Sequence, residues 1–278
     1  WAAVAKALGF KPGSVISASV GRVVSPTMAF RVARLAGVSV DAVLTDPPYF
    51  GMVQYAELME FCFVWLKQLV SHSGNGLSRA TPRDSQELTA NDTLTRGMHH
   101  YTIGLTQVFM RMAVALKVGA PLAFTFHHND IRVYAAVGVA LLDAGLWCTA
   151  SIPCPAEMGG SIHIHGTASS IVDTVFVCRG ATKPTGQATL SSPQAVRAQL
   201  SSDTSLLLAS GYTPTQGDIC CILYGHLTRF AVEHLREQWD TAAPLSTKLA
   251  LLTQIMGEIE DPVAEASVLA TEIRAIAR

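Results

Sequence analysis

The sequence predicts an α/β fold built on a mostly parallel sheet with an antiparallel hairpin at its C-terminal side. Of the 278 residues, 49% are hydrophobic and only 15% are charged, against about 25% charged in an average globular domain. Continuous apolar runs of strand length also alternate with stretches of helical periodicity. Both observations favour a sheet covered on two faces, because the strands of such a sheet are apolar throughout.

Three segments in the first half of the chain have the character of strands. Ser14–Val20 is a short apolar run, and Pro121–Phe126 is a second, continuous one. Val40–Thr45 is a third run, which has to end before Pro47-Pro48 because proline cannot donate to a central ladder. We predict a short strand at the first of these segments and buried strands at the other two.

Helices are predicted between these strands. In Thr102–Leu116, apolar residues recur at the three- and four-residue spacing of one helix face, and Gly119 ends the pattern. The polar segment Ser71–Arg96 precedes this helix and is predicted to be a long loop. The helices predicted in this half are Tyr55–Val70, Thr102–Leu116 and Ile131–Ala144.

A hairpin is predicted to close the sheet. Leu146–Ile152 and Ile171–Cys178 are apolar strands on either side of Pro153–Ser170, a loop that contains glycine and histidine. The order strand, helix, strand, helix, strand, strand then implies parallel strands followed by one antiparallel pair.

The composition changes after Arg179, and this change predicts a boundary. Gly180–Pro193 is rich in Thr, Ser, Gly and Pro, and the rest of the chain is helical in pattern. We therefore divide the chain into residues 1–180, which hold the sheet, and residues 181–278, a helical C-terminal extension. The helices predicted there are Gln194–Leu208, Asp218–Gln238, Leu245–Glu258 and Pro262–Ala277.

The charge balance and the ends of the chain bear on its partners. Lys and Arg number 20 and Asp and Glu 21, so the basic excess common in nucleic-acid enzymes is missing. A DNA-binding surface would have to be a local patch or come from other sequence. With no signal peptide and no membrane-spanning apolar stretch, we expect a cytoplasmic protein without membrane contact. Because the chain begins at Trp1 rather than Met, we interpret it as a fragment.

The cysteines and histidines do not predict a metal site. None of the six cysteines forms a C-x-x-C pair, which argues against a zinc ribbon or a thioredoxin-like motif. His163 and His165 would share one face of an extended segment, but a metal would need further ligands such as His127 or Cys154. We interpret their loop as a contact to nucleic acid or, alternatively, as a solvated hairpin.

Polar motifs follow two of the predicted strands. Asp46-Pro47-Pro48-Tyr49-Phe50 follows Val40–Thr45, and His127-His128-Asn129 follows Pro121–Phe126. Ligands of open α/β sheets bind outside the carboxyl ends of the strands. These two motifs therefore predict the location of a site.

With these motifs the chain resembles the DPPY class of S-adenosylmethionine-dependent amino-methyltransferases, and more narrowly the large prokaryotic adenine-specific DNA methylases. The resemblance covers roughly Val40–Arg179, and beyond the motif it includes Phe61–Trp65, Leu122–Phe126, Ser161–His165 and Val172–Arg179. It implies a Rossmann-like methyltransferase sheet, S-adenosylmethionine as cofactor and DNA as substrate.

The chemistry of the motif suits an exocyclic amine, whose lone pair is delocalised into the base ring. The Asp46 carboxylate and the Pro47 carbonyl could accept both amine hydrogens, an interaction that strengthens as positive charge develops on nitrogen. Pro47 and Pro48 restrict the backbone that carries this carbonyl. Tyr49 offers a ring on which an extruded base can stack, and Phe50 offers a second wall.

The second motif has two compatible interpretations. By the resemblance, His127, His128 and Asn129 help to shape the base site from the neighbouring strand. The alternative is a capped helix start, with Asn129 or Asp130 as the N-cap residue.

The cofactor site is incomplete in this sequence. Enzymes of the superfamily that the chain resembles use a Gly-rich turn after a first strand, and no such turn follows a predicted strand here. Thr45 and Asp46 are the candidate contacts to S-adenosylmethionine. We expect an N-terminal segment before Trp1, or a partner, to supply the rest, and this chain alone to bind the cofactor weakly or not at all.

The leading hypothesis is methyl transfer from S-adenosylmethionine to N6 of adenine in DNA. The same geometry serves the N4 amine of cytosine, and a base in RNA is a further alternative. A non-catalytic nucleic-acid-binding subunit of a modification or defence complex belongs to a different class. The missing glycine motif and the neutral charge favour it, and the intact Asp46–Tyr49 motif disfavours it.

Overall fold

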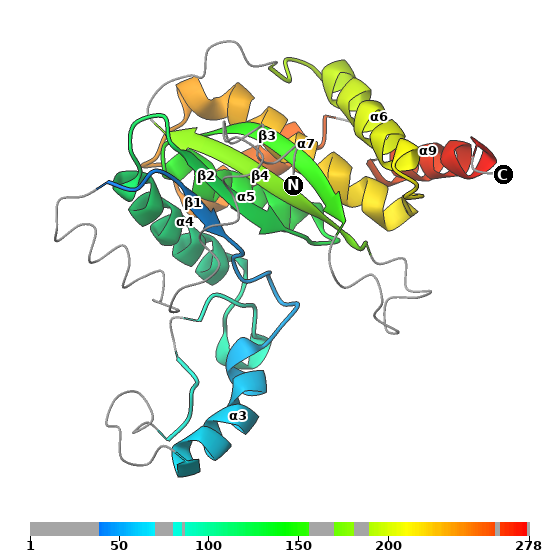
Figure 1. Cartoon of the computed structure of the whole chain (residues 1–278). Coiled ribbons are helices and arrows are strands. Elements are labelled where there is room, and N and C mark those ends of the chain that lie inside the picture. The colour runs from blue at the N-terminus through cyan, green and yellow to red at the C-terminus, as the bar shows by residue number, and fades with distance from the viewer. Residues whose placement is uncertain are drawn as a thin grey trace.

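The computed structural model describes residues 39–69, 80–84, 87–155, 170–180, 189–258 and 262–276. The fold is α/β, and the described strands form one sheet in the order β1-β2-β4-β3 (Figure 1). The strand predicted at Ser14–Val20 lies outside the described residues. The strands are β1 (Val43–Thr45), β2 (Pro121–Phe126), β3 (Leu146–Pro155) and β4 (Val172–Gly180).

The described part of the sheet is mixed, which corrects the prediction of a mostly parallel one. Only β1 and β2 run parallel to each other, with Val43 beside Leu122. The predicted hairpin is present, but its second strand, β4, lies between β2 and β3 and is antiparallel to both. The hairpin thereby contributes two antiparallel pairs instead of one.

The helices follow the predicted periodicity closely. Asp130 is the N-cap of α5, where its side chain accepts a hydrogen bond from the backbone of Arg132, and Gly145 follows α5 with a φ of 72°. Within the described part of the chain, no helix is both long enough and apolar enough to cross a membrane. The helices are α3 (Tyr55–Leu69), α4 (Met98–Ala115), α5 (Ile131–Asp143), α6 (Pro193–Ala209), α7 (Gln216–Leu235), α8 (Leu245–Met256) and α9 (Pro262–Ile276), with 3-10 turns η2 (Asp92–Leu94) and η4 (Arg236–Gln238).

An aromatic core joins the sheet to the helices on one of its faces. Phe124 of β2 and Phe176 of β4 stack with their ring centroids 5.1 Å apart. Tyr134 of α5 meets Phe126 edge-on at 5.1 Å. All four side chains are fully buried, and residues of α4, α5 and α7 complete the same cluster. Burial of rings of this size is a large stabilising contribution.

The C-terminal helices pack on the sheet and on one another. Gly225 of α7 lies so close to the sheet that a Cβ at this position would be 2.7 Å from Ser151 Oγ on β3 and 2.7 Å from Thr174 Cγ2 on β4. The helix α6 packs against α7, α8 against α5 and α7, and α9 against α7. The helical segment predicted from composition therefore shares its core with the sheet.

The helix α3 projects away from the sheet (Figure 1). Glu87 accepts a hydrogen bond from the backbone N–H of Ala56 in its first turn, at 2.9 Å. Most of its apolar side chains are exposed, among them Phe61 at 72% and Trp65 at 55%. The apolar side chains whose spacing predicts this helix are thus mostly not buried against other described residues.

Candidate functional site

The two sequence motifs meet at one edge of the sheet. Because β1 and β2 are parallel, their carboxyl ends lie side by side, and Thr45 pairs with Phe124. The residues that follow, Asp46 after β1 and Thr125 near the end of β2, are therefore neighbours. His127 and His128 come directly after β2. This edge is where an open α/β sheet binds its ligands.

The Asp46 carboxylate is oriented by two hydroxyl groups. Its Oδ1 atom accepts a hydrogen bond from the Tyr49 hydroxyl at 3.1 Å and a second from the Thr125 hydroxyl. No described residue donates to its Oδ2 atom. The Asp46 side chain is exposed, so one carboxylate oxygen is held in place while the other is open to a ligand.

The backbone of the motif is anchored from α4. The hydroxyl of Tyr101, which is fully buried, donates to the Pro48 carbonyl at 3.1 Å. The Tyr101 ring also packs edge-on against Phe50, with centroids 5.3 Å apart. In the described part of the chain, nothing donates to the preceding carbonyl, that of Pro47. The motif therefore carries two acceptors in adjacent residues, Asp46 Oδ2 on an exposed residue and Pro47 O on a buried one.

The Tyr49 ring packs against the carboxyl end of β2. It meets Phe126 edge-on at 5.5 Å and lies tilted against His127 at 6.4 Å. Burial raises the pKa of Tyr49 well above its ordinary value, and the carboxyls of Asp173 and Asp46 raise it further. The hydroxyl consequently keeps its proton and can donate it to Asp46.

His128 uses both ring nitrogens to hold the motif against α5. Its Nδ1 accepts from the backbone N–H of Asp130 at 2.9 Å, so the proton resides on Nε2, which donates to the Phe50 carbonyl at 3.1 Å. Asp130 at the same time caps α5. The interpretation as a capped helix start is thus confirmed, with Asp130 as the cap, and the part of this segment in shaping a base site stays a prediction.

Replacing His128 by glutamine is expected to weaken the fold at pH 8 more than at pH 5. Burial lowers the pKa of His128, against the opposing effects of Asp130 and the Phe50 carbonyl. The neutral ring therefore stabilises the native state above the unfolded pKa of about 6.5, and this stability is lost as the pH falls below that value. At pH 8 the loss of the two hydrogen bonds should cost about 1 kcal/mol, measured by urea unfolding.

His99 provides the control for this comparison. It lies on α4 with an exposed side chain, so His99→Gln should change stability by less than about 0.5 kcal/mol at either pH. A cost of His128→Gln that stays constant from pH 8 to pH 5 would contradict the role assigned to its neutral ring.

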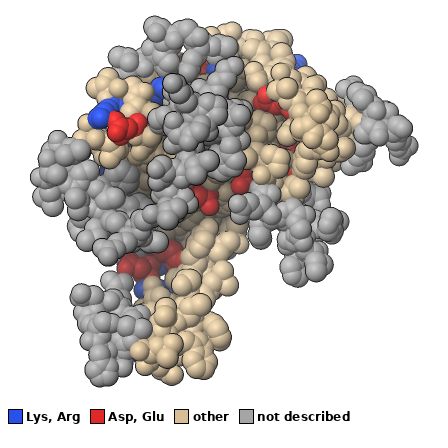
Figure 2. All heavy atoms as spheres, in the orientation of Figure 1, with Lys and Arg blue, Asp and Glu red and all other residues tan. Residues whose placement is uncertain are grey.

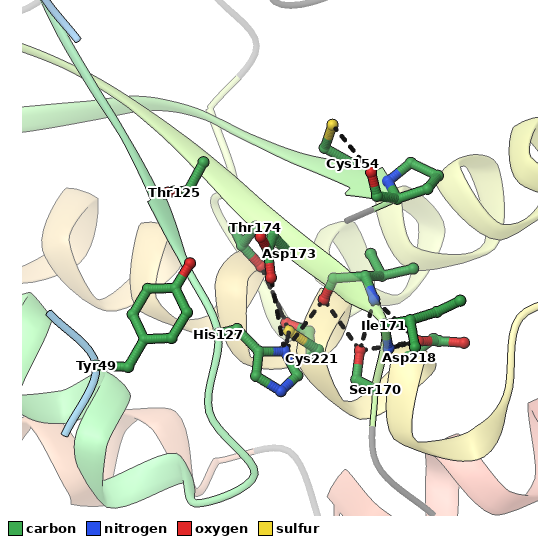
Figure 3. Close-up of polar contacts among 12 residues, drawn as sticks. Tyr49, Thr125, His127, Cys154, Ser170, Ile171, Asp173, Thr174, Asp218 and Cys221 are labelled. Carbon is green, nitrogen blue, oxygen red and sulfur yellow. Dashed lines mark hydrogen bonds and ion pairs between the residues drawn. The ribbon is translucent and has the colours of Figure 1, made fainter. Parts of the chain in front are cut away.

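His127 is buried between β4 and α7 (Figure 3). Its Nδ1 lies 3.3 Å from the Val172 carbonyl, 3.6 Å from Cys221 Sγ and 3.9 Å from a carboxyl oxygen of Asp173. Asn129 is exposed, and its side chain bonds to no described residue. The structure therefore brings His127 and His128 to the site, and gives no contact that ties Asn129 to it.

Three residues of this site are absent from the sequence prediction: Tyr101, Thr125 and Asp173. Thr125 is the one polar residue of β2 and is next to its last residue, while Asp173 is the second residue of β4 and is followed by Thr174. Because β2 and β4 are antiparallel, these positions lie at the same end of the sheet. A polar residue at that end of an apolar run is the signal that could have identified both.

On the face of the molecule drawn in Figure 2, the described Lys and Arg side chains are scattered and form no basic patch. Two arginines near α3 are engaged within the chain. Arg83 pairs with Glu60 at 2.9 Å and Arg96 with Glu87 at 3.3 Å. His163 and His165 lie outside the described residues.

No protein-family model, curated protein or solved structure matches this chain. The case for a function therefore depends on the geometry of the site and on the motif in the sequence.

The described residues do not complete a site for S-adenosylmethionine. Four described glycines have positive φ, and such a turn after a strand would mark the site that the resemblance implies. Gly119, Gly145 and Gly211 each follow a helix, and Gly51 follows the Asp46–Phe50 motif. Thr45 and Asp46 remain the candidate contacts.

Proposed function

We propose that this chain holds the exocyclic amine of a DNA base, most specifically N6 of adenine, for methylation. The observation that carries the proposal is the oriented and exposed Asp46 carboxylate, whose Oδ2 accepts from no described residue, next to the Pro47 carbonyl and the ring of Tyr49. An amine offers two hydrogens, and two acceptors match that number. The resemblance to DPPY-class enzymes supports the same assignment.

The hydroxyls of Tyr49 and Thr125 give the carboxylate its orientation before a ligand arrives. An acceptor that is already oriented costs little reorganisation when positive charge develops on the amine nitrogen. The hydrogen bond from the amine to Asp46 stabilises the transition state more than the ground state, since the amine becomes a stronger donor as it gains charge. Asp46 and the Pro47 carbonyl thus favour the amine as a nucleophile.

Tyr49 is the stacking partner for the base. Its ring is supported by Phe126 and His127, and its hydroxyl is held by Asp46, so it loses little freedom when a base stacks on it. Base–aromatic stacking contributes roughly 1–3 kcal/mol. A base in duplex DNA has to leave the helix to reach this ring.

S-adenosylmethionine would supply the methyl group. The described residues do not complete its site, so we assign to them the binding of the base and of its amine. Thr45 and Asp46 would lie next to the bound S-adenosylmethionine. DNA is the proposed partner.

Nucleoside analysis tests the proposal directly. The full-length protein is incubated with S-adenosylmethionine and unmethylated DNA, the DNA is digested, and its nucleosides are separated by mass. We expect N6-methyladenine. N4-methylcytosine in its place would transfer the assignment to the other amine, and the absence of any methylated nucleoside would overturn the proposal.

A further inference from the structure

Among the described α-helices, α3 alone buries none of its side chains. Its side-chain contacts to the described part of the chain include those of Glu60, which pairs with Arg83 at 2.9 Å and accepts a hydrogen bond from the Thr81 hydroxyl at 3.2 Å. The opposite side of the helix is apolar and exposed, and we call it the α3 face. It consists of Tyr55, Leu58, Cys62, Trp65 and Leu69 along its centre, with Phe61 and Leu66 beside them.

The α3 face has the residue spacing of a helix that packs along another helix. Its central residues, from Tyr55 to Leu69, follow one another at intervals of three, four, three and four positions, which is the heptad pattern of paired helices. None of the seven residues of the face is charged, and three are aromatic. Aromatic residues are enriched and charged residues depleted in the centres of protein interfaces. The face therefore fits an apolar helix of a protein partner.

The α3 face is also large for a surface that stays in contact with water. Tyr55, Phe61 and Trp65 are exposed at 41%, 72% and 55%, which amounts to roughly 300 Å² at about 150–250 Å² for each complete aromatic side chain. Leu58 and Leu69, exposed at 67% and 80%, enlarge this area. The largest apolar patch of a typical monomer covers about 300–600 Å². A patch of this size on one helix indicates a binding surface.

The charges of α3 argue against nucleic acid as the partner. The helix carries Glu57 and Glu60 and a single basic residue, Lys67, which lies over the Phe63 ring. A surface that binds phosphates needs several Lys or Arg side chains. In the described part of the chain, the helices α4 to α9 already contribute buried residues to one core. The described helix whose apolar face is still open is α3, so a second copy of the chain supplies a matching partner.

The apolar residues of α3 are placed symmetrically about Cys62, which lies at the midpoint of the helix and is exposed. Tyr55 and Leu69 are each seven positions from Cys62. Leu58 and Leu66 are each four positions from it. Two copies of α3 that run antiparallel about Cys62 therefore place apolar residues opposite apolar residues along the whole helix. A two-fold interface requires this kind of self-complementary surface.

The charges favour the antiparallel direction. Glu57 and Lys67 are each five positions from Cys62, so an antiparallel pair brings each level with the opposite charge of the other copy, and sets opposite ends of the helix dipoles side by side. We propose that α3 pairs antiparallel with α3 of a second copy of this chain, with Cys62 at the two-fold axis. Each α3 begins close to its own Asp46–Phe50 motif, so the 15-residue helices hold the two motifs about 22 Å apart along the pair.

Sedimentation velocity of the full-length protein tests the pairing over a range of concentrations, because association of two copies depends on concentration. The unchanged protein should form a dimer. Leu58→Glu and Trp65→Glu each place a charge on the face of both copies, and each should raise the dissociation constant of the dimer at least about tenfold. Val64→Glu is the matched control, because Val64 is 49% exposed and lies one turn after Glu60 on the other side of α3. It should leave the dimer unchanged, and circular dichroism should show that all variants are folded.

Cross-linking tests the alignment of the two helices. Cys62 is the one exposed cysteine of the six, so a short bismaleimide should join two copies of the unchanged protein and should not join Cys62→Ser. The direction is tested in the Cys62→Ser background with Tyr55→Cys and Leu69→Cys. A mixture of these two proteins should cross-link, whereas neither should cross-link alone.

The pairing does not depend on the proposed function, since none of these measurements follows methyl transfer. A monomer at every concentration would overturn it, as would a dimer that both Leu58→Glu and Trp65→Glu leave intact. Cross-linking of Tyr55→Cys with itself would show parallel helices and would also contradict the proposal. So would a monomer that binds a DNA oligonucleotide which Trp65→Glu does not bind, because nucleic acid would then cover the face.

Discussion

Replacing Asp46 by alanine is expected to lower methyl transfer to DNA by roughly 10²–10³-fold, the usual effect of removing one preorganised group that stabilises developing charge. Asp46 is exposed and contacts only the hydroxyls of Tyr49 and Thr125 among the described residues, and water can replace both contacts. Folding should therefore be unchanged. The rate is measured in the full-length protein with labelled S-adenosylmethionine, and folding by circular dichroism.

Asp41 is the matched control for Asp46. It is also exposed, lies five positions earlier in the same segment, and pairs with Lys117 at the opposite end of β2 from the site. Asp41→Ala should leave the rate unchanged. Asp46→Asn should lose less activity than Asp46→Ala, because the amide oxygen still accepts but carries no charge. Full activity in Asp46→Ala would show that Asp46 takes no part in the reaction.

The strands and helices could be predicted because their signals are local. The bounds predicted for Pro121–Phe126 are those of β2, since a continuous apolar run ends at the polar residues His127 and His128 and lies just after the turn at Gly119. The order of the strands could not be predicted in the same way. The position of β4 between β2 and β3 depends on pairing between distant residues, such as Leu122 with Cys178, and no local pattern specifies that choice.

The same distinction applies to the candidate site. Asp46, Pro47 and Tyr49 are contiguous, so the sequence alone identifies them. The groups that orient them come from elsewhere in the chain, Thr125 from β2 and Tyr101 from α4. Such residues belong to no sequence motif and act through their position in the folded chain. The sequence marks them only weakly, for example as a polar residue in an apolar strand.

Replacing Asp218 by alanine is expected to be strongly destabilising. Asp218 is fully buried at the start of α7. One carboxylate oxygen accepts from the Ser170 hydroxyl and the Ile171 and Val172 backbone N–H groups, at 2.8 to 3.1 Å. The other accepts from the Tyr212 hydroxyl, the Thr215 backbone and the Thr215 hydroxyl, each at 2.8 Å.

The loss of this carboxylate should cost at least about 3 kcal/mol in the free energy of unfolding. Several donors around it would lose their partner at about 1–3 kcal/mol each when buried, and the capping box of α7 with Thr215 would be broken at about 1 kcal/mol. Urea unfolding measures the change. Asp240→Ala is the control: Asp240 is exposed and accepts one backbone hydrogen bond at 2.8 Å, so its cost should stay below about 1 kcal/mol.

The pH dependence of Asp218 gives this prediction a second measurement. Burial raises the pKa of Asp218, but hydrogen bonds from Thr215, Ser170 and Tyr212 outweigh burial and hold it below its ordinary value. The contribution of Asp218 to the free energy of unfolding is therefore complete above its pKa in the unfolded chain, about 3.9. This contribution is lost as the pH falls through the lower pKa of the folded state. The cost of Asp218→Ala should accordingly shrink in acid, whereas a cost independent of pH would show that packing, not the carboxylate, is responsible.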